Sequence, residues 1–209
     1  MSRFLPSALV GLSILSSTAC TPRDSSSAPK TSQPPTETSP PRTNRWAPDS
    51  MYLDKLDSPF DVGGYRIRPP KGFTLNKSKT GGSTTFIWQG PARSDKSTPK
   101  LWVIVGRMGP GEEKMSLEET NAILIGAAKR KMDDYTATPV EHGKIGNLPV
   151  IRMTFHGTEK EPPRYKGHTV AYHAHDGQQY IHIMTLDVEP HWIDSFLLLE
   201  SAARTLEKN

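Results

Sequence analysis

The feature that most constrains the fold of this chain is the proline-rich stretch between residues 21 and 48. It contains 7 Pro, 5 Ser and 5 Thr, and Trp46 is its only large apolar residue. Such a composition buries too little apolar surface to offset the entropy of ordering, so we expect residues 20–48 to form a disordered tether. Proline favours extended conformations, which would give the tether reach. An alternative role as a docking ligand rests on the pairs Pro34-Pro35 and Pro40-Pro41.

The segment before the tether has the features of an export signal. It has a basic residue at Arg3, a mainly apolar run over residues 4–14, and small residues from Ser16 to Ala19. A basic start, a short apolar core and small residues before the cleavage point are typical of a signal peptide. The apolar run is shorter than the roughly 20 residues that a membrane-spanning helix needs. We therefore expect residues 1–19 to be a signal peptide and the protein to be exported.

Cys20 is the only cysteine of the chain and directly follows Ala19. This pattern resembles a bacterial lipoprotein signal, although Ser17 stands where that family prefers leucine. The resemblance implies that Cys20 is diacylated, with palmitate among the expected acyl groups, and anchors the protein in the cell envelope. Thr21 replaces the aspartate that signals inner-membrane retention in some bacteria, which favours the outer membrane. The alternative is ordinary cleavage near Ala19, which would leave a free thiol in an exported protein.

The remaining residues, 49–209, have the length of a single globular domain. Five basic and two acidic residues precede it, so 21 of the 26 basic and 20 of the 22 acidic side chains belong to it. Its net charge is therefore only +1, and bulk charge gives no reason to expect nucleic acid as a partner. The domain contains no cysteine, so its core must form without a disulfide.

Apolar patterning predicts a mixed α+β fold. Ser116 and Glu119 form a capping box that begins a helix, and Asp176-Gly177 is a strong hairpin signal between two strands. Strands joined by short turns must be antiparallel, so the simplest arrangement is an antiparallel sheet sandwiched by helices. The predicted elements are strands over 60–68, 86–89 and 101–105, a helix over 116–134, strands over 135–144, 148–156, 166–175 and 178–188, and a helix that opens at Pro190 with apolar residues at Trp192, Phe196, Leu199, Ala203 and Leu206.

One motif resembles a known family. The segment from Tyr65 to Phe73, a strand that ends in a proline-glycine-aromatic turn, is similar to the opening of the PsbP-like superfamily. That group includes the extrinsic PsbP subunit of photosystem II and bacterial lipoproteins of the LpqN type. The resemblance implies an α/β/α sandwich over residues 49–209, and a binding or scaffolding role rather than catalysis. It implies no functional residue, because members share the fold without sharing a function.

Five of the seven histidines lie between His156 and His182, and three of them are candidate metal ligands. His173 and His175 share one face of a predicted strand, about 6.5–7 Å apart. A two-residue hairpin loop would place His182 diagonal to His173, and a four-residue loop would place the two directly opposite. A three-residue loop would put His182 on the other face and separate the cluster.

In the first two registers the three imidazoles could bind Zn²⁺ and leave a fourth position open for a water molecule and hydrolysis. The simpler interpretation is that the histidines occupy a partly wet sheet face. The opposite face of the hairpin looks better buried, because it carries Val170, Tyr172, Ala174, Ile181 and Ile183.

No other pattern in the sequence indicates catalysis, since the domain has neither a G-x-S-x-G motif nor a phosphate-binding loop. We therefore expect a non-catalytic, lipid-anchored extracytoplasmic domain that docks an envelope protein or another ligand. Two alternatives stay open. One is a metal-binding protein or metal-dependent hydrolase that uses His173, His175 and His182, and the other is a structural envelope lipoprotein without a specific ligand.

Overall fold

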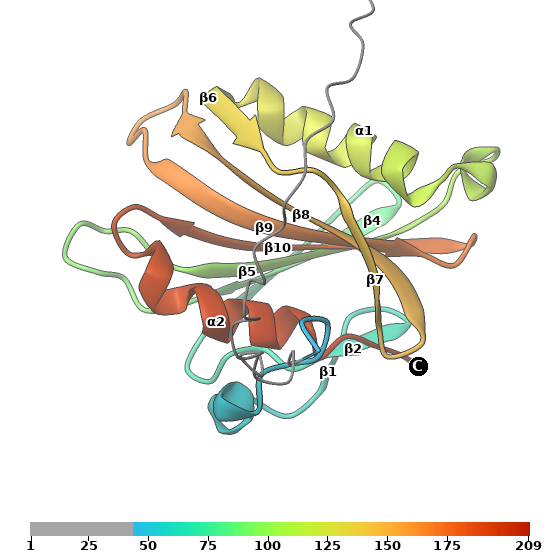
Figure 1. Ribbon diagram of the computed structural model, residues 1–209, viewed down its shortest axis with the longest axis horizontal. Coiled ribbons are helices and arrows are strands. Elements are labelled where there is room, and N and C mark those ends of the chain that lie inside the picture. The colour runs from blue at the N-terminus through green and yellow to red at the C-terminus, as the bar shows by residue number, and fades with distance from the viewer. Residues whose placement is uncertain (1–43) are drawn as a thin grey trace, which may run out of the picture. The chain divides into compact units, whose positions relative to one another are not determined.

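The structure is a computed structural model that describes residues 44–209 (Figure 1). The expected signal peptide, Cys20 and nearly all of the expected tether lie outside the described residues. The described helices are α1 (Leu117–Arg130) and α2 (Trp192–Ala203), with short 3-10 helices η1 (Ser50–Lys55) and η2 (Glu112–Lys114). The strands are β1 (Phe60–Asp61), β2 (Tyr65–Ile67), β3 (Thr74–Thr80), β4 (Ser83–Gln89), β5 (Lys100–Arg107), β6 (Met132–Ala137), β7 (Glu141–Ile145), β8 (Leu148–Glu159), β9 (Lys166–His175), β10 (Gln179–Val188) and β11 (Glu207–Lys208).

An antiparallel eight-stranded sheet organises the fold. Its strand order is β3-β4-β5-β10-β9-β8-β6, and β7 also pairs with β8. A small sheet of order β1-β2-β11 accompanies it. Helices α1 and α2 lie on opposite faces of the large sheet (Figure 1). The expected α+β sandwich is therefore confirmed.

Each face of the large sheet has its own apolar core, because successive side chains of a strand point to opposite sides. On the α2 side, Leu199 of the helix belongs to the same buried cluster as Val103 and Ile183 of the sheet. On the α1 side, a smaller cluster joins Ile125 of the helix to Phe155 of β8. Burying one such side chain contributes about 1.5–3 kcal/mol. Both helices are thus held by apolar contact with the sheet.

Helix α1 begins as the sequence predicts and ends earlier. The Ser116 hydroxyl accepts from the Glu119 N–H at 3.1 Å, and the Glu119 carboxylate accepts from the Ser116 N–H at 2.8 Å, which completes the capping box. The helix stops at Arg130, although we expected it to reach Asp134. The chain enters β6 at Met132 instead, because Met132 packs into the α1-side core.

The expected strand over residues 60–68 is two short strands. The chain turns at Gly63 and Gly64, whose φ angles of 87° and 99° are easily adopted only by glycine. This turn folds β1 back onto β2. The expected strand over residues 135–144 is also divided, into β6 and β7, and Pro139 lies between them. Proline lacks the N–H that a strand would use there.

Strand β3 was not expected from the sequence. It forms one edge of the large sheet, and six of its seven residues are exposed. Lys77 and Lys79 lie on it, and lysine on an edge strand discourages pairing with other chains. A strand of this kind carries no apolar alternation, so the pattern that reveals buried strands is absent from it.

Two buried carboxylates fasten α2 to the sheet. Asp187, at the end of β10, has a fully buried side chain and receives two bonds of 2.7 Å from the Arg93 guanidinium. It also accepts a hydrogen bond from Ser195 of α2. Glu200 of α2 accepts from the Tyr172 hydroxyl at 2.6 Å and from Arg152 at 2.8 Å. These bonds fix both the position of α2 and its rotation about its own axis.

The Asp187 ion pair provides a test of this fastening. Replacing Asp187 with Ala leaves the Arg93 charge partly buried without its partner, so we expect a loss of about 3–5 kcal/mol in unfolding free energy. The control is Asp133→Ala, which breaks an exposed pair with Arg164 and should change stability by at most about 1 kcal/mol. Urea denaturation of both variants measures the difference. Equal losses would show that the buried pair contributes no more to stability than the exposed pair.

Candidate functional site

The register of β9 and β10 brings the three candidate histidines to one face of the sheet. His173 lies directly opposite His182, and His175 lies opposite Tyr180. This is the pairing that we expected for a four-residue loop. The ring centroids are 5.8 Å apart for His173 and His182, and 6.2 Å apart for His173 and His175. His173 is therefore the central ring of the cluster.

The histidine face is not the partly wet surface that we expected. His173 and His182 are each only 1% exposed. Helix α1 lies on this side of the sheet (Figure 1), and its Asn121 amide approaches the Met153 sulfur at 3.3 Å. For His173 and His182 the expectation of a wet face is wrong, because hairpin patterning alone does not show what packs against the sheet. The opposite face is buried as well, so the hairpin is covered on both sides.

Several histidine ring nitrogens are buried without a partner. Within residues 44–209, both nitrogens of His173, both of His175 and Nδ1 of His182 have no hydrogen-bond partner. An unpaired buried polar group costs about 1–3 kcal/mol. Burial lowers the pKa of His173 to about 3, with a smaller effect from the neighbouring histidines, and lowers the pKa of His182 to about 4. Both rings are consequently neutral near pH 7, with a lone pair free to bind a ligand.

The surroundings of the His173–His182 pair are uncharged. Ile104 lies opposite His182 on β5, and Ile151 lies opposite His173 on β8. Tyr180 borders the cluster, with its ring centroid 6.3 Å from that of His173. Its ring rests on Gly106, where an added Cβ would lie only 2.6 Å from the ring. These neighbours offer the imidazoles apolar contact.

The histidines do not form a ready three-ligand metal centre. Among residues 44–209, no group of three His, Cys, Asp or Glu side chains is placed to hold a metal ion. The arrangement offers neighbouring pairs of imidazoles instead. The zinc site of His173, His175 and His182 stays a prediction.

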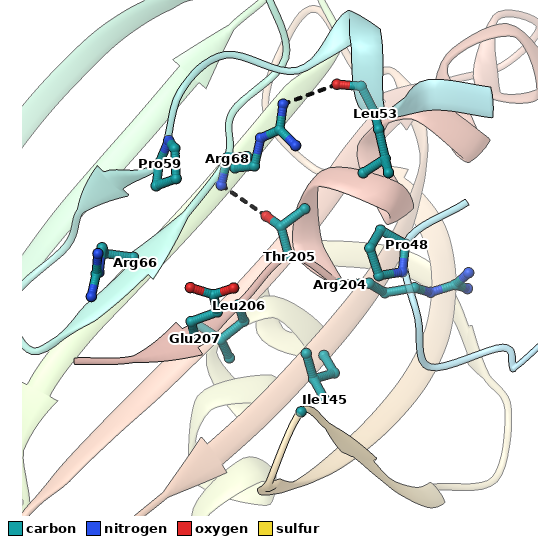
Figure 2. Close-up of a pocket in the computed structure, with 11 residues that line it drawn as sticks. Pro48, Leu53, Pro59, Arg66, Arg68, Ile145, Arg204, Thr205, Leu206 and Glu207 are labelled. Carbon is teal, nitrogen blue, oxygen red and sulfur yellow. Dashed lines mark hydrogen bonds between the residues drawn. The ribbon is translucent and has the colours of Figure 1, made fainter. Parts of the chain in front are cut away.

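A second candidate is a cavity of about 280 Å³ beside the C-terminal residues (Figure 2). Arg66, Arg68 and Arg204 are among the residues that line it. Arg68 donates to the Leu53 carbonyl at 3.0 Å, and Arg204 donates to the Glu200 carboxylate. These two guanidinium groups are therefore held by acceptors of the protein itself. The cavity is better explained as part of the framework than as an anion site.

A third candidate is an apolar surface on α2, which we call the α2 strip and which consists of Trp192, Ile193, Phe196 and Leu197. Ile193 is 82% exposed and Leu197 is 44% exposed. Trp192 and Phe196 are half-buried, and their ring centroids lie 4.9 Å apart. Trp192 also stacks on His168 at 5.4 Å, which ties the strip to the sheet.

Sequence reasoning did not find the α2 strip. The predicted apolar residues Trp192 and Phe196 do pack against the α2-side core, but each is only half-buried. The available signal was the pair Ile193 and Leu197, because each follows a stripe residue directly and is rotated away from the core side of the helix. Large apolar residues in that position are candidates for contact with another molecule.

The expected lipid attachment at Cys20 lies outside the described residues. No helix within residues 44–209 is both long and apolar enough to cross a membrane.

Comparison with solved structures identifies the fold. Cyanobacterial PsbP (CyanoP) from Synechocystis sp. PCC 6803 matches with a TM-score of 0.56 and 12% identity, over 77% of this chain and 96% of that protein. The fold is PsbP-like. A Pseudomonas aeruginosa protein of unknown function gives a TM-score of 0.46 and 9% identity, over 74% of this chain and 97% of its own. A Bacteroides thetaiotaomicron protein gives a TM-score of 0.41 and 12% identity, over 73% of this chain and 48% of that protein.

The PsbP-like fold is seen in the three-dimensional comparison and not at the level of sequence. No family model matches this chain, and no curated protein matches it either. At 12% identity, the likeness to CyanoP shows the architecture alone.

The buried histidines predict acid sensitivity of the metal-free protein. Both pKa values lie below the ordinary value of 6.5, so the unfolded chain binds more protons than the folded chain between about pH 6.5 and pH 4. The stabilisation is complete above pH 6.5 and is lost as the pH falls. With chelator present, we expect unfolding free energy to drop by roughly 2–4 kcal/mol from pH 7 to pH 5, measured by urea denaturation.

The control for this prediction is a double variant, His173→Leu with His182→Leu. It lacks both titrating groups, so its stability should depend less on pH over the same range. An equal drop in the variant would assign the acid sensitivity to other groups.

Proposed function

We propose that this protein is a lipid-anchored, extracytoplasmic binding domain that docks another envelope protein through the α2 strip, without catalysing a reaction. The observation that carries the proposal is the exposure of Ile193 and Leu197, one turn apart on a helix that is itself firmly fastened. Aromatic residues such as Trp192 and Phe196 are enriched at protein interfaces. A rigid helix also loses little conformational entropy on binding.

Charge at the border of the α2 strip favours a protein over a lipid surface. Asp194 lies in the first turn of α2 beside the strip and is exposed, and its charge also acts on the nearby Arg93. The last turn of α2 carries no basic residue. An anionic phospholipid surface would be repelled by this charge, whereas a protein patch bordered by Lys or Arg would complement it. The partner we propose is therefore an envelope protein with an apolar patch and a basic border.

The proposed attachment rests on the sequence. The export signal, the single cysteine at position 20 and the proline-rich tether together favour a domain held near a membrane at variable distance. The likeness to PsbP concerns the architecture of the domain alone. The proposed partner is inferred from the α2 strip and the charge beside it.

The docking surface can be tested by crosslinking in native envelopes. We expect a specific crosslinked partner for the unaltered protein, and a loss of roughly tenfold or more in crosslinking for Ile193→Glu with Leu197→Glu, because the substitutions place charge within the apolar patch. Asp194→Lys should also weaken the complex, since it reverses the charge at the border.

The matched control for the docking test is Ile123→Glu. Ile123 is likewise an exposed apolar residue, at 59%, but it lies on α1 on the other side of the sheet. It should leave crosslinking unchanged. Absence of a partner, or equal effects of the Ile123 and α2-strip variants, would overturn docking through α2.

The anchor is tested by Cys20→Ser. The substitution removes the thiol that would carry the lipid, so we expect the protein to move from the membrane pellet to the soluble fraction after cell fractionation. One acyl chain binds a protein to a membrane only marginally, whereas two anchor it stably. Loss of a diacylated cysteine should therefore shift most of the protein to the soluble fraction. Retention of the variant in membranes at the level of the unaltered protein would contradict lipid attachment at Cys20.

A further inference from the structure

We infer that His173 and His182 form a buried binding site for monovalent copper, Cu(I). The two residues face each other across β9 and β10 with ring centroids 5.8 Å apart, and each is 1% exposed. Both nitrogens of His173 and Nδ1 of His182 have no hydrogen-bond partner within residues 44–209. This site is independent of the docking function proposed above.

The geometry suits one metal ion between two rings. Metal–nitrogen bonds to imidazole are about 2 Å long, so two imidazoles on opposite sides of one ion place their ring centres roughly 6 Å apart. The observed separation of 5.8 Å is close to that value. The 6.2 Å between His173 and His175 is equally close, but His175 is only half-buried, so the fully buried pair is His173 with His182. A neutral imidazole is the form that binds metal, and both rings are kept neutral by burial.

The number of ligands favours Cu(I) over zinc. Within residues 44–209 no three metal-binding side chains converge, whereas structural zinc sites use four ligands and catalytic sites use three with a water molecule. Cu(I) is a closed-shell ion that is stable with two nitrogen ligands in a line. A pair of opposed histidines is therefore a sufficient site for it.

The surroundings also favour a soft ion of low charge. The residues opposite the pair on the neighbouring strands are Ile104 and Ile151, and neither offers a carboxylate to balance a second positive charge. Burying a divalent ion without such balance is much less favourable than burying a monovalent one. Met184 lies two residues after His182 on the same strand face, and thioethers belong to the soft ligands that select Cu(I).

Copper titration tests the site directly. The probe is Cu(I), added anaerobically with a reductant to the full-length chain carrying Cys20→Ser, which removes the only thiol. Competition with a coloured Cu(I) chelator should give one ion per chain. X-ray absorption at the copper edge should show two nitrogen neighbours.

The variants separate the two ligands from their neighbours. His173→Leu and His182→Leu should each weaken Cu(I) binding by roughly 100-fold or more, because each removes one of two bonds. His175→Leu, inside the cluster, and His142→Leu, exposed on β7, should leave affinity within about threefold. Leucine keeps the buried positions apolar, and urea denaturation verifies that each variant is folded.

Three results would overturn the inference. The first is no Cu(I) binding. The second is an equal loss with His175→Leu, which would indicate a three-ligand site. The third is Zn²⁺ binding as tight as that of Cu(I). None of them affects docking through α2, because crosslinking is measured without added metal and on the other face of the sheet.

Discussion

The pairing of β9 with β10 sets which of their side chains face α1 and which face α2. Side chains alternate between the faces of a sheet, so the register places His173 and His182 on the α1 side and Tyr172 on the α2 side. A register shift of one residue would move all the side chains of one strand to the opposite face of the sheet. Tyr172 and Glu200 would lose their buried bond, or the two imidazoles would no longer face each other. Both apolar cores therefore depend on one register.

Polar bonds then decide what α2 presents to solvent. An apolar stripe alone allows a helix to rotate somewhat over a sheet, because apolar contact is non-directional. The bonds from Ser195 to Asp187 and from Tyr172 to Glu200 remove that freedom. With the rotation fixed, Ile193 and Leu197 cannot turn toward the core. The exposure of the α2 strip is thus a consequence of the buried carboxylates beneath the helix.

Local signals predicted the elements whose stabilising contacts are close in sequence. The capping box at Ser116 and the hairpin around Gly177 both hold, because neighbouring residues determine them. Strand β3 was missed since an exposed edge strand has no apolar alternation. The small sheet was missed because Glu207 joins Arg66 from the far end of the chain.

The candidate sites were predictable to different extents. The sequence indicated that the three histidines could share a face, but it could not indicate that His173 and His182 would be buried. That burial depends on packing between segments that are distant in sequence. The exposure of Ile193 likewise depends on the rotation of α2, which is set by Asp187 and Glu200 rather than by the pattern of the helix itself.

The two proposed sites differ in accessibility, and the difference has a kinetic consequence. The α2 strip is already at the surface, so docking there requires no rearrangement of the domain. The His173–His182 pair is enclosed by Tyr180 and the α1 side of the sheet, so an ion can enter only when this region opens locally. Local opening has its own free energy and is slow compared with surface encounter. Metal exchange should therefore be limited by protein motion, while docking is limited by diffusion and orientation.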